Sequence, residues 1–294
     1  MKKMFKKLYL LAAAGLVALS CSLVKEDRTD CPFTAPVNVQ LSGFSYIQDD
    51  LPDTKAQAVT QYNGVKVLTL AFYGSDGTEI FKSTQDRKTA EDFGTFSTSL
   101  PLGNYTMVAL GYVLYDDDTV TLTSPNEAEY TGGFVRETFA VTQAVNVTST
   151  SALNLSATLN RIITCLQVVS TDGKTANVSK VRMTFSDGGK AFNPTTGLAT
   201  VNTGSSSTVG VSAAVGATST STGFVFLQTD EQTMDVTIET LDADGNTIFS
   251  QTVPNVPFKR NRRTILSGKI YSASASAGSF QLNTTWEEDH SGSF

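Results

Sequence analysis

The stretch Lys180-Val181-Arg182-Met183-Thr184-Phe185-Ser186-Asp187-Gly188 decides the fold class of this chain. Apolar Val181, Met183 and Phe185 alternate with polar neighbours, and this period of two places them on one face of a β-strand. The Asp-Gly pair that follows predicts a tight turn, because glycine readily adopts the positive φ that hairpin turns require. The stretch is therefore typical of a half-exposed strand that ends in a turn.

The same pattern recurs along the chain. Alternating strands are also predicted at residues 37–41 and 234–238, while residues 65–73 and 161–169 are apolar on both faces and are expected to be central strands. A segment rich in Ser, Thr and Gly, residues 203–223, predicts a long loop with one weak strand at 209–215. The sequence thus predicts an all-β chain of antiparallel strands.

Composition excludes several classes of protein. The chain has 294 residues, with 40% hydrophobic and only 17% charged residues, which argues against disorder. Its 22 basic and 28 acidic residues give a net charge of −6. Four of the lysines precede residue 20, so their removal with a leader leaves 18 basic residues and a net charge of −10. No nucleic-acid partner is expected for so acidic a chain.

The N-terminal residues are typical of an export signal. A basic start is followed by an apolar run at residues 8–20, which ends in Ala18-Leu19-Ser20-Cys21. As a helix this run reaches about 20 Å, short of the roughly 30 Å membrane core, so we interpret residues 1–20 as a signal peptide. Ser20 before Cys21 resembles the lipobox of bacterial lipoproteins, which implies cleavage between them and lipid on Cys21. The alternative is an ordinary secretory signal.

A polar tether is expected at residues 21–34. Within it, Lys25-Glu26-Asp27 resembles the tag that exports lipoproteins of certain Gram-negative anaerobes to the cell exterior. A solvated tether of mixed charge explains the same residues equally well. Small polar residues near Thr150 predict a domain boundary, which gives an N-terminal domain at 35–150 and a C-terminal domain at 151–294.

The sequence offers little for catalysis, and we expect no enzyme, no catalytic residues, no metal and no cofactor. His290 is the single histidine, and three cysteines lack the spacing of metal ligands. Asp242 to Asn246 resembles half of a calcium loop, but a hairpin turn is favoured because the closing glutamate is missing. Residues 116–118, all aspartate, are expected to form a charged loop tip.

Two further features are left open by the residues alone. Cys31 and Cys165 could form a disulfide outside the cytosol, with a buried thiol at Cys165 as the alternative. Lys259-Arg260-Asn261-Arg262-Arg263 is a dense basic cluster, which is expected to be an exposed loop dispensable for folding. Docking of this cluster to an acidic neighbour is the other interpretation.

Four stretches together resemble the fimbrillin superfamily, the lipoprotein subunits of type V pili. Residues 21–32, the expected start of the mature chain, resemble the start of its anchor lipoproteins. The other three are Leu100-Pro101-Leu102-Gly103-Asn104-Tyr105, Leu159-Asn160-Arg161-Ile162-Ile163 and residues 256–268. The resemblance implies two tandem transthyretin-like antiparallel β-sandwich domains, other pilus subunits as partners, and a place in a fimbrium on the outer membrane, where Cys21 carries the lipid.

Within this superfamily the resemblance implies two different roles. Stalk subunits lose their first strand to an arginine-preferring protease and polymerise by strand exchange, whereas an anchor keeps the segment that carries its lipid. Arg28 lies before the first predicted strand and Arg87 lies well beyond it. We therefore expect an anchor or terminal subunit that retains its first strand. The alternatives are a main stalk subunit, or a carbohydrate- or host-binding lipoprotein that uses tyrosines such as Tyr112, Tyr115 and Tyr130.

Overall fold

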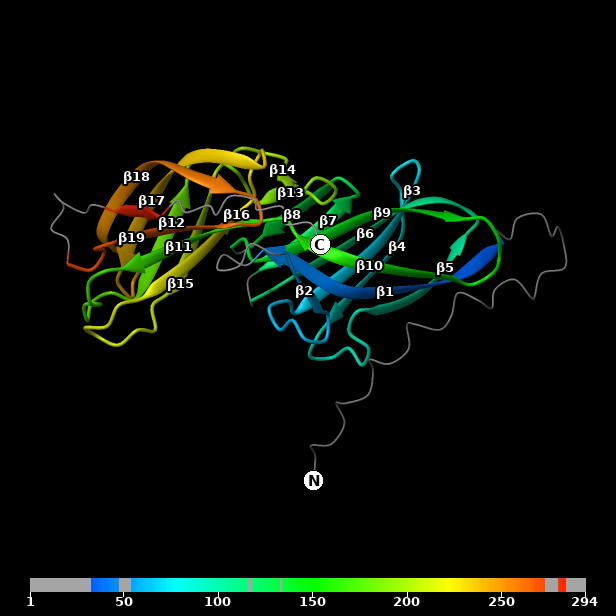
Figure 1. Cartoon of the computed structure of the whole chain (residues 1–294), viewed down its shortest axis with the longest axis horizontal. Helices are drawn as coiled ribbons and strands as arrows, with labels where there is room; N and C mark the ends of the chain where they lie inside the picture. Colours follow the sequence, from blue (N-terminus) through cyan, green and yellow to red (C-terminus); the bar gives the residue numbers. More distant parts are fainter. Residues whose placement is uncertain (1–32, 48–53, 116–117, 133, 273–279, 284–294) are drawn as a thin grey trace, which may run out of the picture.

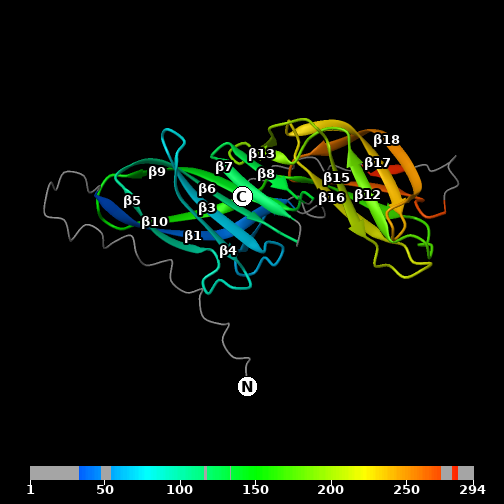
Figure 2. The same cartoon turned by 180° about the vertical axis from the view of Figure 1, so that it is seen from behind.

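The computed structural model describes residues 33–47, 54–115, 118–132, 134–272 and 280–283 (Figure 1). These residues form strands and turns, without a helix. Two sandwich-like bodies lie side by side along the long axis of the molecule, and short strands occupy the junction between them (Figures 1 and 2). The all-β prediction is confirmed.

The first body is one curled eight-stranded sheet in the order β2-β1-β10-β9-β6-β3-β4, and β5 pairs with β1 on the same edge as β2. The apolar side chains on one face of this sheet form a single core. The strands are β1 (Thr34–Ile47), β2 (Thr54–Ala58), β3 (Val67–Gly74), β4 (Glu79–Asp86), β5 (Thr95–Pro101), β6 (Gly103–Tyr112), β9 (Thr138–Val147) and β10 (Leu153–Arg161).

The second body packs two four-stranded sheets over a second core, in the orders β16-β11-β19-β20 and β15-β12-β17-β18. Its strands are β11 (Thr164–Ser170), β12 (Lys180–Phe185), β15 (Ser205–Gly210), β16 (Thr220–Val225), β17 (Glu231–Leu241), β18 (Thr247–Lys259), β19 (Arg263–Gly268) and β20 (Gln281–Asn283).

A small sheet joins the two bodies. It runs β14-β13-β8-β7 and contains β7 (Thr119–Ser124), β8 (Glu127–Thr131), β13 (Ala191–Asn193) and β14 (Leu198–Ala199). Because β8 belongs to the first half of the chain and β13 to the second, their pairing is a hydrogen-bonded link between the bodies. A third apolar core lies around this link.

Several predicted strands are confirmed. Val181, Met183 and Phe185 are buried on β12 while their neighbours are partly exposed, as the alternation predicted. Residues 37–41 lie in β1 and residues 234–238 in β17. Residues 65–73 supply β3, which is buried on both faces because one side contacts the first core and the other contacts the core at the junction.

The central strand predicted at residues 161–169 is confirmed from Thr164 onward, where β11 pairs with β16 and β19, but its first three residues are not part of it. β10 ends at Arg161 and β11 starts at Thr164 in a different sheet. Between them, Ile162 and Ile163 are both buried in the junction core, which explains why this segment is apolar on both sides.

The expected boundary near Thr150 also differs from the strand pairing. β10 follows that boundary but pairs with β1 and β9 of the first body. The change from one set of sheets to the other therefore follows Arg161. The small polar residues before β10 connect β9 and β10, two strands of the same sheet.

The long loop expected at residues 203–223 contains two strands, β15 and β16. Their low hydrophobicity has a packing reason. Ser207 and Ser221 are buried on these strands, and a side chain at Gly223 would meet Met183 of β12. Small residues are needed here because the large side chains of β12 fill the space between the sheets.

Candidate functional site

The first strand, β1, is the element on which the expected assembly role depends. Its side chains Ala35, Val37, Val39, Leu41 and Phe44 are each no more than 1% exposed and lie in the first core. Alternation places them all on one face until a bulge between Leu41 and Gly43 shifts the register. β1 is therefore part of the structural centre of its domain.

Both edges of β1 are paired. One edge forms a parallel ladder of eight registered pairs with β10, from Val37 opposite Leu153 to Ser45 opposite Asn160. The other edge pairs antiparallel with β5 over Thr34–Gln40 and then with β2 over Gly43–Ile47. The backbone donors and acceptors of β1 thus have neighbours on either side, and no groove is left at this position for a strand from another chain.

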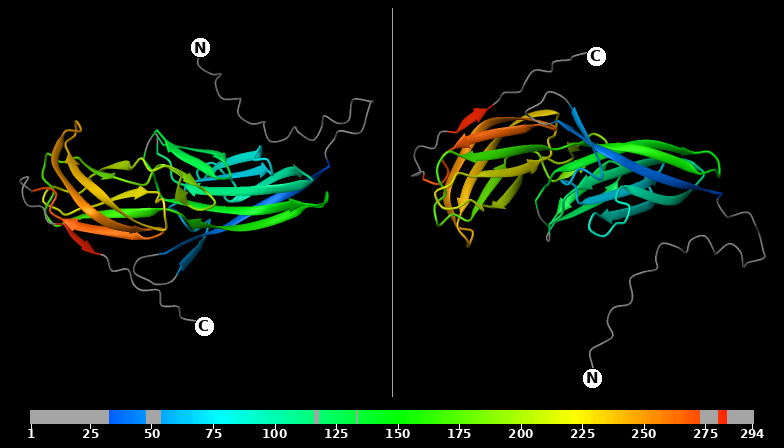
Figure 3. Two further views of the ribbon diagram at one scale, coloured as in Figure 1. Left: turned by 90° about the horizontal axis from the view of Figure 1, so that it is seen from above. Right: turned by 60° about the horizontal axis from the view of Figure 1, so that its bottom comes forward.

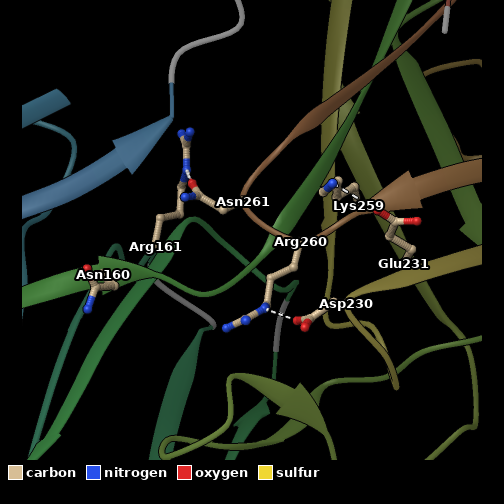
Figure 4. A pocket seen from close by; sticks show the side chains of 7 residues that line it. All are labelled: Asn160, Arg161, Asp230, Glu231, Lys259, Arg260 and Asn261. Atoms are coloured by element: carbon tan, nitrogen blue, oxygen red, sulfur yellow. Dashed lines mark hydrogen bonds and ion pairs between the residues drawn. The ribbon is translucent and has the colours of Figure 1, made fainter. Parts of the chain in front are cut away.

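A second notable region is a polar cleft of about 760 Å³ at the junction (Figure 4). It is lined by Asn160, Arg161, Asp230, Glu231, Lys259, Arg260 and Asn261. Arg260 Nε donates to Asp230 over 2.7 Å, and Lys259 Nζ forms an ion pair with Glu231 over 2.8 Å. These cations have acidic partners in the same chain, so their charge is largely compensated.

The basic cluster at 259–263 is therefore not the exposed loop that was expected. Lys259 and Arg260 are half-buried because β17 pairs with β18, which places Glu231 directly opposite Lys259. Arg260 also donates to the backbone oxygen of Thr196 over 3.1 Å. The acidic partners that the structure shows for Lys259 and Arg260 are Glu231 and Asp230 of the same chain, and docking of this cluster to another molecule stays an untested alternative.

Arg161 ties the two bodies together at the end of β10. Its Nε donates to Asn261 over 2.8 Å and its Nη1 donates to Glu137 over 3.0 Å, while the guanidinium lies 5.2 Å from the ring centre of Tyr46 (Figure 4 shows the bond to Asn261). Tyr62 donates to the other oxygen of Glu137 over 2.7 Å. Burial raises the pKa of Tyr62, and the charge of Glu137 adds to this shift, so the phenol stays protonated at neutral pH. The arrangement is a structural joint without a group activated for catalysis.

The aspartate run at 116–118 contains a buried anchor. The carboxylate of Asp118 accepts hydrogen bonds from the backbone of Tyr115 and Phe134 and from Arg136 Nε, the last over 3.0 Å. Its residue is only 5% exposed. The expectation of a charged loop tip is wrong for Asp118, because residues 134–136 fold back onto it.

The tyrosines considered for sugar binding are mostly not on the surface. Tyr112 and Tyr130 are 3% and 1% exposed in the junction core, where Tyr112 bonds to Thr69 and Tyr130 to Thr138. Tyr115 alone of the three is exposed. These rings therefore stabilise the junction and do not form an aromatic binding surface.

The remaining site predictions meet the structure only in part. Ser20, Cys21, Cys31 and the possible tag Lys25, Glu26 and Asp27 lie outside the described residues. Cys165 is half-buried on β11, and its disulfide with Cys31 stays a prediction. Asp242 accepts from the backbone and side-chain amides of Asn246 over 2.8 and 2.9 Å, which is the hairpin turn that the sequence favoured.

The described part of the chain contains neither a helix suited to crossing a membrane nor a cluster of three metal-ligating side chains. Sequence reasoning missed the structural role of Arg87. Its guanidinium donates to the backbone oxygens of Val59, Tyr62 and Val65 and lies 4.2 Å from the ring centre of Phe93. No local signal marks it, because the acceptors precede it by more than twenty residues.

Comparison with known proteins bears on the fold. The fimbrial anchor protein Mfa2 from Porphyromonas gingivalis superposes with a TM-score of 0.51 at 13% sequence identity, over 86% of this chain and 98% of that one. A candidate adhesin from Bacteroides ovatus gives a TM-score of 0.49 at 11% identity, over 79% of this chain and 87% of its own. The expected resemblance to fimbrial proteins is confirmed at the level of the fold.

Sequence comparison gives one family. No curated protein matches the chain by sequence. A family model described as a family of unknown function, DUF6562, matches residues 35–292. Because this match spans both bodies, the chain belongs to the DUF6562 family.

Proposed function

We propose that the chain is a surface lipoprotein of a type V pilus, which anchors or ends the fibre at the outer membrane through lipid on Cys21. The observation that carries the proposal is the position of β1. This strand follows the tether directly and completes the core and both ladders of its own domain. In a subunit that keeps this strand, the lipid-bearing Cys21 stays covalently connected to the folded domain.

Loss of β1 would be costly for the first domain. It would remove Val37, Val39, Leu41 and Phe44 from the core, and truncation of one large buried side chain already costs about 2–5 kcal/mol. Whole domains are stable by only about 5–15 kcal/mol. The domain would therefore need a replacement strand, which is what a stalk subunit obtains and what an anchor does not require.

The setting of Arg87 supports an unprocessed subunit. Arg87 is the first arginine within the described residues, and three backbone carbonyls and the ring of Phe93 hold its side chain. A protease needs an extended and accessible substrate segment. Cleavage at Arg87 would require this part of the domain to open first, so the described fold protects the bond.

The comparison with Mfa2 adds support from the fold. Mfa2 is named a fimbrial anchor protein, and its chain is covered almost completely. Fold alone does not decide function, so this likeness supports the proposal without carrying it. The partners proposed here are other pilus subunits and the outer membrane.

Lipid attachment can be tested by metabolic labelling with a fatty-acid analogue. The native chain and the Ser22→Ala variant should carry label, whereas Cys21→Ala should not, because Cys21 alone supplies the attachment point. Equal labelling of Cys21→Ala would refute the lipid anchor.

The fibre role can be tested by immunogold microscopy of cells with and without the gene. An anchor predicts that fibres assemble but are shed into the medium when the gene is absent, and that Cys21→Ala gives the same result. Unchanged cell-bound fibres in the deletion strain would contradict the proposal and favour a separate binding lipoprotein.

A further inference from the structure

Two strand pairs differ from all the others that the structure describes. β1 pairs with β10 and β11 pairs with β19 in parallel, whereas the remaining described pairs are antiparallel. Each parallel pair joins the first strand of a body to a late strand of the same body: β10 is the last strand of the first body, and β19 precedes only β20 in the second. The same arrangement thus occurs twice along one chain.

The direction of these strands has a mechanical consequence. The chain enters β1 at Thr34, at the far end of the first body, and leaves β10 at Arg161, at the junction (Figure 3). Tension along the chain pulls the two strands in opposite directions along their common axis. Ladder hydrogen bonds lie across the strands, so this pull shears all the rungs together. Tension that separates strands from one end breaks rungs one after another.

We propose that β1/β10 and β11/β19 are two shear clamps in series, which allow the chain to bear tension along its length. The inference deepens the proposed function, since an anchor lies between the membrane and the fibre. The first clamp has eight registered pairs and the second has six, from Cys165 opposite Arg263 to Ser170 opposite Gly268.

Further contacts reinforce the first clamp. Across the parallel ladder, Asn38 donates to Asn154 over 3.1 Å and Ser42 donates to the backbone oxygen of Ala157 over 3.1 Å. On its other edge β1 forms seven registered pairs with β5. β1 cannot slide toward the tether without breaking both ladders and withdrawing its buried side chains.

The second clamp is fastened at its exit. The backbone N–H of Thr171 donates to Gly268 over 2.9 Å and extends the ladder beyond β11. The carboxylate of Asp172 then accepts from the backbone of Ile270, Tyr271 and Ser272 over 2.7 to 3.0 Å. The segment that follows β19 is therefore bound to the segment that follows β11, at the point where a force applied at Lys269 would enter the second clamp.

The two clamps are joined without a flexible linker. Only Ile162 and Ile163 separate β10 from β11, and both are buried in the junction core. Arg161 binds Glu137 and Asn261 on either side of this connection. Tension can pass from one clamp to the next through packed structure.

Single-molecule force spectroscopy on the mature chain tests the inference. Azide-bearing residues serve as attachment points at Phe33 and Lys269 for pulling along the chain. Attachment at Phe33 and Ser151, or at Thr171 and Lys269, loads one clamp from a single end. All four positions are exposed. The unfolding force is expected to be several-fold higher along the chain than in either other geometry, and similar forces in all three would overturn the clamps.

Two variants separate the clamp from general stability. Gln40→Pro removes a ladder N–H from β1, which is paired on both edges, and should sharply lower the force along the chain. Met107→Ala removes a buried side chain from β6, outside the loaded pair, and should lower equilibrium stability with little change in that force. Equal loss of force in both variants would refute the clamp, and if Gln40→Pro does not fold, the comparison of geometries decides. If the chain resists force but Cys21 carries no lipid, the proposed anchoring role is refuted and the shear clamps are not.

Discussion

Asp118 is a buried charged residue whose role in the fold is not evident from its neighbours in the sequence. In the sequence it ends a run of three aspartates, a pattern typical of a solvated loop. In the structure its side chain is 2% exposed and binds Arg136, whose own side chain is 19% exposed. Besides the nearby backbone of Tyr115, its partners Phe134 and Arg136 lie 16 and 18 residues further along the chain, so no local pattern could indicate them.

We predict that Asp118→Ala lowers the free energy of unfolding by about 3–5 kcal/mol, because it leaves Arg136 without its charge partner in a buried site. Urea denaturation measures the change. The matched control is Glu79→Gln, which removes an exposed pair with Lys82 and should cost at most about 1 kcal/mol. A similar small loss in both variants would show that Asp118 is not an anchor.

Asp172 gives a prediction for pH. Burial alone would raise the pKa of its carboxyl group, but hydrogen bonds from Ser272 and from the backbone of Ile270 and Tyr271 outweigh burial and lower the pKa below 3.8. A depressed pKa means that the ionised carboxylate stabilises the fold above the pKa of the unfolded chain. This stabilisation is lost as the pH falls through about 4 toward the lower folded-state pKa.

Asp172→Asn should therefore lower the free energy of unfolding at neutral pH and flatten its decline below about pH 4. Denaturation at a series of pH values measures both effects. Asp244→Asn, in the exposed turn before β18, serves as the control and should follow the native pH profile. If Asp172→Asn also shows the pH profile of the native chain, the Asp172 carboxylate does not stabilise the fold by binding residues 270–272.

At the scale of elements, periodicity predicted the strands that have one face in a core and one in water. β1, β12 and β17 belong to this class. It failed where a strand is made of small polar residues, as in β15 and β16, because burial there depends on large side chains of a neighbouring strand. It also failed at Ile162 and Ile163, which are apolar because they lie between two bodies.

The role of β1 in the first core leads to a stability prediction. Leu41→Ala should cost about 2–5 kcal/mol, since Leu41 is fully buried at the centre of the sheet. Leu102→Ala, at a 43% exposed position between β5 and β6, should cost no more than about 0.5 kcal/mol. Hydrogen exchange should locate the loss of protection in β1, β5 and β10. Loss confined to β1 would show that the strand is a loosely attached segment.

At the scale of the molecule, the junction decides whether two bodies act as one. Phe192 of β13 stacks on Phe226 with ring centres 4.1 Å apart and planes at 14°, and Tyr130 of β8 lies beside both rings. The sequence did not predict this core, because its residues come from both halves of the chain and follow no shared period. The alternative of a sugar-binding protein would place Tyr112 and Tyr130 on the surface, whereas both are buried in this core.

We expect the native chain to unfold in one calorimetric transition, because the junction core couples the bodies. Phe192→Ala removes a fully buried ring, should cost about 3–5 kcal/mol and should split the transition into two. Ile248→Ala, at a 39% exposed position, is the control and should leave one transition. Two transitions in the native chain would show that the bodies unfold independently.

The central claim is that the protein functions with its first strand in place, attached through Cys21. Peptide mapping and intact mass of the protein recovered from fibre-bearing cell envelopes test it most directly. We predict that this protein begins at lipid-modified Cys21 and contains β1, Thr34–Ile47. Recovery of a chain that begins between Ser42 and Lys66, without the main part of β1, would contradict it and identify a stalk subunit.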